Sequence, residues 1–498
     1  MKKPLAVFVF TLVFVLFWAS ARGGDATDIR TPPAPHTPRI NGPAVFGARP
    51  GSPFLYHIPT TGDRPMEYSA TGLPRGLALD SKTGDITGSL AKIGNYTVTL
   101  RAKNALGADK KKFKIVIGET IALTPPMGWN SWNHFAEHVT GEIVLATAHA
   151  MVDTGLINHG WTYVNIDDTW QGKRGGPFKA LQGNEKFPDM KGLCDAFHAL
   201  GLKVGIYSTP WVTSYAGFAG GSSDNEDGAW QPPARGERNQ HRMGKYSFAD
   251  GDAKQWAAWG MDYLKYDWNP NRLPETSEMH QALRHSGRDI IFSLSNTTPF
   301  TNAPTLTQIA NCWRTTGDIK ANWRSMSARG FGQDKWSPYA RPGHWNDPDM
   351  LEIGTKERGQ PGLTHDEEYT HMTIWCLDSA PLLLGNDLSG LDAFTLNVLE
   401  NDEVLEVNQD ALGEQAVTIA SDDDIKVYAK DLADGSKAVG LFNLGTNGVT
   451  NITVSFKLLG ISGSHPVRDL WRQKDLGKFR GEFSLPVAPH SAELVKIR

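Results

Sequence analysis

The sequence predicts a three-part protein: an N-terminal β-sandwich of Ig-like type, a central (β/α)8 TIM barrel and a C-terminal antiparallel β-sandwich. Its 498 residues are enough for about three domains. Between about residues 122 and 413, short β-rich segments alternate with stretches that can hold a helix. Strand and turn patterns fill the chain before and after this region, so three parts are expected.

Residues 1–21 have the three parts of a secretory signal peptide. Lys2 and Lys3 precede an apolar run over residues 5–18, and Ala19-Ser20-Ala21 forms an A-x-A cleavage site. The apolar run is short for a membrane span, and no other candidate follows. We therefore expect an exported protein, periplasmic or extracellular, with no membrane contact after signal cleavage. Residues 22–38, rich in Thr, Pro and Ala, are typical of a linker.

Composition narrows the class of protein further. The formal net charge is −4 and no basic stripe stands out, so nucleic acid is not an expected partner. The oligomeric state is left open. Cys194, Cys312 and Cys376 form an odd and sparse set for an exported chain. A disulfide framework is therefore not expected to stabilise this protein.

Residues 39–118 carry the signals of a small Ig-type sandwich. Residues 96–101 and 112–117 alternate polar and apolar side chains, and turn signals recur over residues 72–80 and 83–88. The Leu-Pro-x-Gly-Leu and Asp-x-x-Thr-Gly-x-Ile-x-Gly patterns resemble an Ig-like module often attached to bacterial exported hydrolases. Its role is that of a spacer, a packing partner or a carbohydrate binder, and the first two are favoured.

Residues 119–413 are predicted to form the barrel. Helix-like runs occupy residues 141–155, 189–200 and 252–260. Almost every β-rich segment begins apolar and ends polar, as expected where the carboxyl ends of barrel strands carry an active site. A doubly wound sheet would normally show a Gly-rich phosphate loop, and none follows any segment. The eight segments are 127–132, 162–170, 203–208, 263–268, 289–295, 311–318, 344–349 and 381–387.

Residues 414–498 return to a strand pattern. Residues 425–430 and 437–443 flank Asp434-Gly435, which is a hairpin signal, and residues 451–456 and 491–497 continue the pattern. The sequence therefore predicts a C-terminal antiparallel β-domain, organised as a sandwich.

The segment from Asp262 to Trp268 carries the most informative chemistry. Lys265 and Asp267 lie two apart, so a strand would point both to one face, and the cation would help keep the carboxylate ionised. An ionised carboxylate on a rigid element suits a nucleophile or a ligand binder. Other acids end the predicted strands: Asp167, Asp168, Asp318, Asp347, Asp349 and Asp387.

Two chemical classes need several acids at one end of a barrel. One is a divalent metal site, and the other is sugar chemistry with a carboxylate pair. His134 and His344 are isolated, which disfavours zinc. Aromatic side chains on the same end favour a sugar pocket. They are Trp129, Trp132, Trp170, Trp268 and Trp345.

Four motifs are specific enough to suggest a family. They are TPPMGWNSW at residues 124–132, NIDD at 165–168, YLKYD at 263–267 and WNDPDM at 345–350. In order and spacing they resemble the α-galactosidase (melibiase) family, glycoside hydrolase family 27. The resemblance implies a TIM barrel followed by a β-sandwich. It also implies retaining cleavage of terminal α-linked galactose-type sugars, with no cofactor and no metal.

The resemblance also implies roles for individual residues. Asp267 matches the nucleophile and Asp318 the acid/base. Lys265 and Arg314 match ligands of sugar hydroxyls, Asp167 and Asp168 match the pair that holds the 4- and 6-hydroxyls, and Trp129 and Tyr207 match pocket walls. Because Asp318 would face the negative charge of Asp267, we expect Asp318 to hold the proton.

Two positions depart from the family pattern. Asn269 and Leu294 stand where many relatives carry cysteines, so packing replaces the disulfides there. Ser295 stands where typical α-galactosidases have the glutamate that contacts the 2-hydroxyl. The α-N-acetylgalactosaminidases of the family also have a serine at this position. An α-galactosidase is therefore expected, with N-acetyl-α-galactosaminides or β-L-arabinopyranosides as alternative substrates. A carbohydrate-binding protein with an inactive barrel and a divalent-metal enzyme are the alternatives from other classes.

Overall fold

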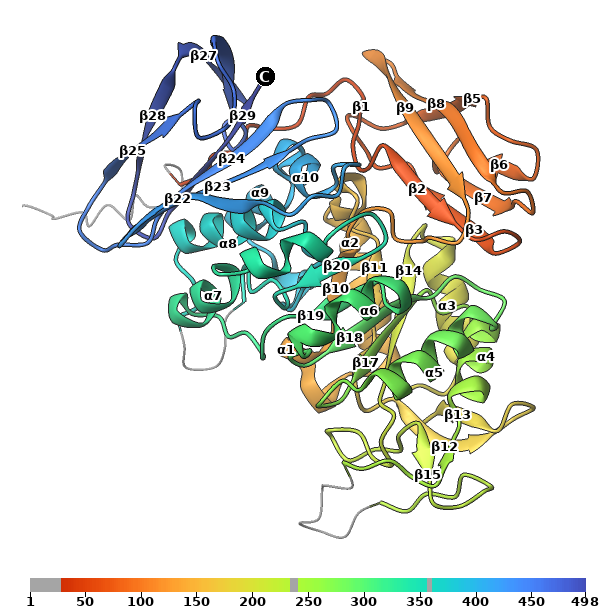
Figure 1. Cartoon of the computed structure of the whole chain (residues 1–498). Coiled ribbons are helices and arrows are strands. Elements are labelled where there is room, and N and C mark those ends of the chain that lie inside the picture. The colour runs from red at the N-terminus through yellow and green to blue at the C-terminus, as the bar shows by residue number, and fades with distance from the viewer. Residues whose placement is uncertain (1–27, 233–240, 356–360) are drawn as a thin grey trace, which may run out of the picture.

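The computed structural model describes residues 28–232, 241–355 and 361–498, and the expected signal peptide lies outside them. Three bodies follow one another along the chain in Figure 1: an N-terminal module in red and orange, a central barrel from yellow to cyan, and a C-terminal domain in blue. The predicted fold class is confirmed.

The barrel is a sheet of eight strands that are all parallel to their neighbours. Each of the eight predicted segments contains one strand. The order is β20-β19-β18-β17-β14-β11-β10-β21, and a bridge between Leu351 and Leu384 joins its two ends. The strands are β10 (Met127–Asn130), β11 (Tyr163–Asn165), β14 (Lys203–Ser208), β17 (Tyr263–Asp267), β18 (Ile291–Ser295), β19 (Cys312–Arg314), β20 (Trp345–Asp347) and β21 (Leu382–Leu384).

Helices connect and cover these strands. Two of them, α2 and α3, fall in predicted helix-like runs, and α4 overlaps the third run but begins three residues before it. Thr140 and Asp189 cap α2 and α3 by accepting backbone N–H groups of the first turn. The hairpin β12–β13 (Gln171–Gly175, Ala180–Gly183) and a two-residue antiparallel ladder, β15–β16 (Ser222–Ser223, Tyr246–Ser247), interrupt the alternation. The helices are α1 (Trp132–Phe135), α2 (Gly141–Asp153), α3 (Met190–Ala199), α4 (Ala249–Trp259), α5 (Leu273–Arg284), α6 (Ala303–Ile309), α7 (Trp323–Gly330), α8 (His365–Leu377), α9 (Ala393–Leu399) and α10 (Asp402–Asn408).

The N-terminal module is a sandwich of two sheets around its own core. Strands β2-β9-β8-β5 form one sheet and β3-β7-β6 the other, with Phe54, Ile86 and Phe113 buried between them. The strands are β1 (Arg39–Ile40), β2 (Val45–Ala48), β3 (Pro53–His57), β4 (Thr60–Thr61), β5 (Glu67–Thr71), β6 (Leu77–Leu79), β7 (Asp85–Ser89), β8 (Gly94–Asn104) and β9 (Gly107–Ile117).

The C-terminal domain pairs a six-stranded sheet, β22-β23-β24-β29-β26-β27, with the two-stranded sheet β25-β28. The predicted hairpin is confirmed: β23 and β24 are antiparallel, and Gly435 in the turn has a φ of 81° that suits glycine. The strands are β22 (Val417–Asp422), β23 (Ile425–Asp431), β24 (Lys437–Asn443), β25 (Thr450–Ser455), β26 (Ser464–Asp469), β27 (Lys474–Arg480), β28 (Glu482–Val487) and β29 (Ala492–Ile497).

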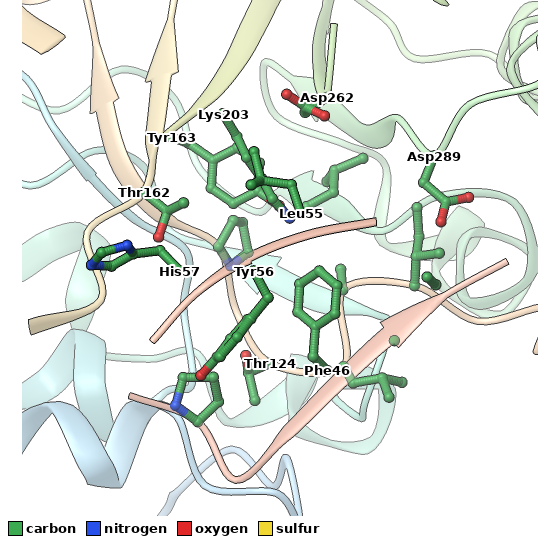
Figure 2. Close-up of a pocket in the computed structure, with 18 of the residues that line it drawn as sticks. Phe46, Leu55, Tyr56, His57, Thr124, Thr162, Tyr163, Lys203, Asp262 and Asp289 are labelled. Carbon is green, nitrogen blue, oxygen red and sulfur yellow. The ribbon is translucent and has the colours of Figure 1, made fainter. Parts of the chain in front are cut away.

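The module packs against the amino-terminal ends of the barrel strands. Arg49 of the module forms an ion pair with Asp289, which precedes β18, at 2.5 Å. Between the two bodies lies a cavity of about 290 Å³. Figure 2 shows Phe46 and Tyr56 of the module on one side of it and Tyr163 and Lys203 of the barrel on the other.

The first described residues bind to parts of the molecule that lie far along the chain. The Arg30 guanidinium group donates hydrogen bonds to Asp366 of α8 and to the carbonyl oxygen of Ala492 in β29, both at 2.9 Å. Thr31 exchanges hydrogen bonds with Asn397 of α9. This part of the segment expected to be a linker is therefore fixed against the barrel and the C-terminal domain.

Cys194, Cys312 and Cys376 are all free and buried, which agrees with the expectation that disulfides do not stabilise the fold. Within residues 28–232, 241–355 and 361–498, no helix combines the length and the apolar character that crossing a bilayer requires.

Candidate active site

The predicted site residues gather at the carboxyl-terminal end of the barrel. Each lies in a barrel strand or in the loop that directly follows one, because parallel strands present their carboxyl ends at one side of a closed sheet. In chain order they are Trp129 in β10, Asp167 and Asp168 after β11, Tyr207 in β14, Lys265 and Asp267 in β17, Ser295 in β18, Arg314 in β19 and Asp318 after it.

Lys265 forms its ion pair with an acid that follows another strand of the barrel, β11. Its ammonium group lies 2.8 Å from a carboxylate oxygen of Asp167. Burial opposes the charge of Lys265, but the negative charges of Asp167 and Asp267 raise the pKa of Lys265 above its ordinary value. Lys265 therefore remains a cation at neutral pH, two residues from Asp267 on the same strand.

Asp267 ends β17 and is only 7% exposed. Burial raises the pKa of Asp267 to about 6, and the charge of Lys265 opposes this rise without cancelling it. The side-chain amide of Asn296 donates a hydrogen bond to one of the Asp267 oxygens. The carboxylate is thus ionised above about pH 6 and is oriented by a neutral donor.

Asp318 has different surroundings. Its side chain is 84% exposed, and Arg314 donates a hydrogen bond to it at 3.1 Å while also pairing with Asp349 at 2.9 Å. Partial desolvation raises the pKa of Asp318, but the charge and hydrogen bond of Arg314 outweigh it and hold the pKa below its ordinary value. We expected Asp318 to hold the proton, and this prediction is wrong: the pKa of Asp267 is the one that is raised. The reason is that Arg314 pairs with the exposed Asp318, whereas Asp267 is the more deeply buried acid.

Asp167 and Asp168 are held by hydrogen bonds from their own loop and from the loop that follows β14. Asp168 accepts hydrogen bonds from the backbone N–H groups of Thr169 and Ala216 and from the side chain of Gln171, at 2.7–2.9 Å. Burial nevertheless raises the pKa of Asp168. Both carboxylates are therefore fixed hydrogen-bond acceptors, which suits the recognition of hydroxyl groups.

The three remaining residues line the same end of the barrel. Trp129 is fully buried, and its indole N–H donates to the carbonyl oxygen of Asn386 at 2.7 Å. The Tyr207 ring lies 5.7 Å from the Lys265 ammonium group. Ser295 pairs with Asp267 in the parallel register of β17 and β18, so the short serine stands beside the candidate nucleophile.

Two residues near the carboxylates were not among the predicted site residues. Asn296 follows β18 with a φ of 68°, a conformation that asparagine tolerates better than most residues, and this turns its amide toward Asp267. Tyr215 is half-buried, and burial and the charges of Asp267 and Asp318 all raise its pKa. The Asn296 side chain also hydrogen-bonds to Tyr215. An Asn at a strand end was a usable signal, whereas Tyr215 lies in an irregular loop that no periodicity marks.

The other acids of this region hold the fold together. Asp349 accepts from Arg314 and from the backbone N–H of Ile319, and its own N–H donates to Asp347 at 2.8 Å. Burial raises the pKa of Asp347 to about 6. Among the described residues, no three His, Cys, Asp or Glu side chains are grouped so that they could hold a metal ion. The cavity of Figure 2 lies at the opposite end of the barrel, away from Asp267 and Asp318.

Each of the three parts of the chain matches the model of a known protein family. The Alpha galactosidase A model matches residues 124–230 and 239–410. The model of the Alpha galactosidase C-terminal beta sandwich domain matches residues 422–497, and that of the Putative Ig domain matches residues 37–118.

Individual proteins match over most of their length. Alpha-galactosidase from Oryza sativa subsp. japonica is 37% identical over 413 residues, which are 81% of this chain and 91% of the relative. A putative alpha-galactosidase from Bacteroides fragilis is 35% identical, with a TM-score of 0.83 over 93% of this chain and 98% of that one. A GH27 β-L-arabinopyranosidase from Geobacillus stearothermophilus is 29% identical, with a TM-score of 0.63 over 76% of this chain and 97% of that one.

Proposed function

Because this chain belongs to the Alpha galactosidase A family of glycoside hydrolases, we propose that it is an exported α-galactosidase that releases terminal α-linked galactose with retention of configuration. Export to the periplasm or the cell exterior is supported by the signal-peptide pattern of residues 1–21. The observation that carries the proposal is the environment of Asp267: a buried carboxylate at the end of β17, with the Lys265 cation and the Asn296 donor beside it. A second acid, Asp318, acts with Asp267 on the same Tyr215 side chain.

The first step forms a glycosyl-enzyme. A carboxylate oxygen of Asp267 attacks the anomeric carbon while the bond to the leaving-group oxygen breaks, and Asp318 donates a proton to that oxygen. Asp167, Asp168, Lys265 and Arg314 bind the sugar hydroxyls. The negative charge of Asp267 is consumed in the new ester bond.

In the second step Asp318, now a carboxylate, takes a proton from water, and the water oxygen attacks the anomeric carbon from the side opposite the ester bond. Asp267 leaves with its electron pair, and two inversions give net retention. Asp318 must be protonated before the first step, although Arg314 favours its ionised form. We infer that a sugar in the site draws the Arg314 guanidinium toward its hydroxyls and shields the exposed Asp318 from water, and both effects raise its pKa.

The test uses purified protein, a panel of nitrophenyl glycosides and NMR detection of the first product anomer. We expect turnover of the α-galactoside with the α-anomer released first. Asp267→Asn is expected to abolish turnover, and Asp318→Ala to lose most of it but recover with azide, which needs no general base. An inverted product contradicts the double displacement, and near-native turnover by Asp267→Asn contradicts the choice of nucleophile.

Ser295 favours a second candidate substrate, an N-acetyl-α-galactosaminide. Serine is shorter than glutamate and uncharged, so the pocket beside the sugar 2-position is roomier. Losing a charged hydrogen bond to a hydroxyl costs roughly 1.5–3 kcal/mol, about one to two orders of magnitude in rate.

Ser295→Glu tests this assignment. We expect it to lower kcat/KM for the 2-acetamido substrate by steric exclusion and to leave or raise kcat/KM for the galactoside. The quantity to compare is the ratio of the two constants before and after the substitution. An unchanged ratio means that Ser295 does not contact the 2-position.

A further inference from the structure

Charge is unevenly distributed between the Ig-like module and the rest of the chain. Residues 39–118 contain twelve Lys and Arg residues but only five Asp and Glu, a net charge of +7. Because the whole chain carries −4, the residues outside the module carry −11. A polyanion near this molecule is therefore attracted to the module and repelled by the remainder.

The excess cations are concentrated on one surface. In β8 and β9 alternate side chains point outward, and five of these outward positions hold a cation. We call this surface the basic face; it consists of Arg101, Lys103, Lys110, Lys112 and Lys114. The four lysines are exposed and Arg101 is half-buried. The expectation of no basic stripe was wrong, because the alternation of two paired strands gathers cations that look scattered in the sequence.

The cations of the basic face repel one another. Arg101 lies directly opposite Lys110 in the antiparallel register, an arrangement that destabilises a sheet when both charges are alike. Within the described part of the chain, no ion pair with Asp or Glu involves any of the five. Glu67, which faces Lys103 from β5, is the acid nearest in register. The module elsewhere pairs its charge, as Arg49 does with Asp289.

The other side chains of this surface indicate the kind of partner. Thr97 and Thr99 of β8 and Ser69 and Thr71 of β5 lie among the cations, and they offer hydroxyl groups. Tyr68 is buried on the inner side of the sheet and cannot stack on a ligand from outside. Lys110, Lys112 and Lys114 are spaced about 7 Å apart along β9. Such a surface binds repeated negative charges by ionic contacts and hydrogen bonds.

We propose that the basic face is a docking surface for an acidic polysaccharide whose sugars carry carboxylate groups. The four lysines of the basic face are exposed, and Figure 1 shows β8 on the side of the module away from the C-terminal domain. The choice of a sugar polymer rests on the proposed function, because a module joined to a glycoside hydrolase gains from holding the barrel near carbohydrate. The docking surface itself requires no turnover.

The experiment measures binding of the full-length protein to polygalacturonate by affinity electrophoresis, with neutral galactomannan and duplex DNA as comparison polymers. We expect retardation by polygalacturonate that weakens as salt is raised. A triple variant, Lys110→Gln with Lys112→Gln and Lys114→Gln, is expected to bind at least tenfold more weakly. The matched control, Arg75→Gln with Lys82→Gln and Lys92→Gln, removes three exposed cations elsewhere on the module and is expected to stay within twofold of the wild type.

Replacing Lys110, Lys112 and Lys114 by arginine keeps the positive charge and is expected to keep the affinity for polygalacturonate. The thermal midpoint and the turnover of a nitrophenyl galactoside show that each variant is folded. Turnover is expected to be unchanged, and the midpoint of the glutamine variant is expected to be no lower than that of the wild type, because removing Lys110 relieves its repulsion by Arg101. The proposal is overturned if the wild type is not retarded, or if the two glutamine variants lose binding equally. It is also overturned if DNA binds as tightly as polygalacturonate. Failure of the proposed function appears separately, as loss of turnover with binding intact.

Discussion

At the scale of single residues, the active site contains an acid whose ionised form is costly to keep. Burial raises the pKa of Asp267 from 3.8 to about 6. Between these values the folded protein binds more protons than the unfolded chain, so stability falls as pH rises through this range. Above about pH 6 the full cost is present, roughly 3 kcal/mol for a shift of this size.

Asp267→Asn is therefore expected to unfold at a higher temperature than the wild type at pH 7, even though it is inactive. The gain should shrink toward pH 4, where the folded-state carboxyl is protonated and the unfolded-state carboxyl, with a pKa of 3.8, is only partly ionised. Thermal unfolding followed by circular dichroism at the two pH values measures it. Asp318→Asn is the control: Arg314 lowers the pKa of Asp318, so removing this acid should bring no gain. A midpoint for Asp267→Asn below that of the wild type at pH 7 would contradict the cost ascribed to burial.

The sequence predicted that the carboxylates gather at one end of the barrel. It did not predict which cation each of them pairs with. The spacing of Lys265 and Asp267 predicted a shared face, yet Lys265 makes its ion pair with Asp167, which β11 brings in from another part of the chain. Likewise, Arg314 pairs with Asp318 and Asp349 at once. Partners of this kind depend on the closed sheet, and a linear pattern does not contain them.

At the scale of elements, the close packing of the barrel strands depends on particular glycines. Gly205 of β14 faces Asn165 of β11, and a methyl group added at Gly205 would lie 1.9 Å from the Asn165 side-chain oxygen. Rotating the amide away does not remove the clash, because the Asn165 Cγ and Cβ atoms would lie 2.6 and 3.1 Å from the added methyl group and Asn165 is buried.

Gly205→Ala is expected to destabilise the protein by about 1–3 kcal/mol or more, the cost of overpacking a rigid core. Urea unfolding monitored by tryptophan fluorescence measures the change. Gly390→Ala is the matched control, because the added methyl group would meet no atom within 4 Å. Equal midpoints for the two variants would show that β11 and β14 are less tightly packed than described.

The strands could be predicted and the irregular loops could not, for a physical reason. Eight segments with apolar beginnings and polar ends reveal a barrel because burial and function impose that pattern on each strand. The β12–β13 hairpin, the β15–β16 ladder and the loop that carries Tyr215 show no hydrophobic periodicity, neither of 2 residues nor of 3.6. Their conformations are fixed by single contacts, such as the hydrogen bond from Ala216 to Asp168.

At the scale of the whole molecule, the contact between module and barrel encloses a cation. Lys203, at the start of β14, is 9% exposed, and its ammonium group lies 4.3 Å from the centre of the Phe46 ring. Figure 2 shows both residues at the cavity between the two bodies. Burial lowers the pKa of Lys203 to about 8, and the charges of Asp262 and Asp289 offset only part of this effect.

Because the folded pKa lies below the ordinary value of 10.5, the unfolded chain binds more protons between about pH 8 and 10.5, and stability rises with pH there. Lys203→Met keeps an apolar chain and removes the charge. We expect a higher thermal midpoint at pH 7 and a smaller rise between pH 7 and 9.5 than in the wild type. Burial also lowers the pKa of Lys430 to about 8, and this residue adds the same pH dependence of stability to the wild type and to Lys203→Met. A lower midpoint at pH 7 for Lys203→Met would mean that the contact with Phe46 outweighs the cost of burial.

The hydrogen bonds of Arg30 limit when its segment can attach to the rest of the protein during synthesis. During synthesis Arg30 emerges before its acceptors, because Asp366 and the carbonyl oxygen of Ala492 lie 336 and 462 residues further along the chain. The aromatic ring beneath its guanidinium group, that of Tyr369, is also a late arrival. The segment around Arg30 therefore cannot form these contacts until α8 has been synthesised. A chain that stops before β29 would lack the hydrogen bond to Ala492 and hold this segment less firmly.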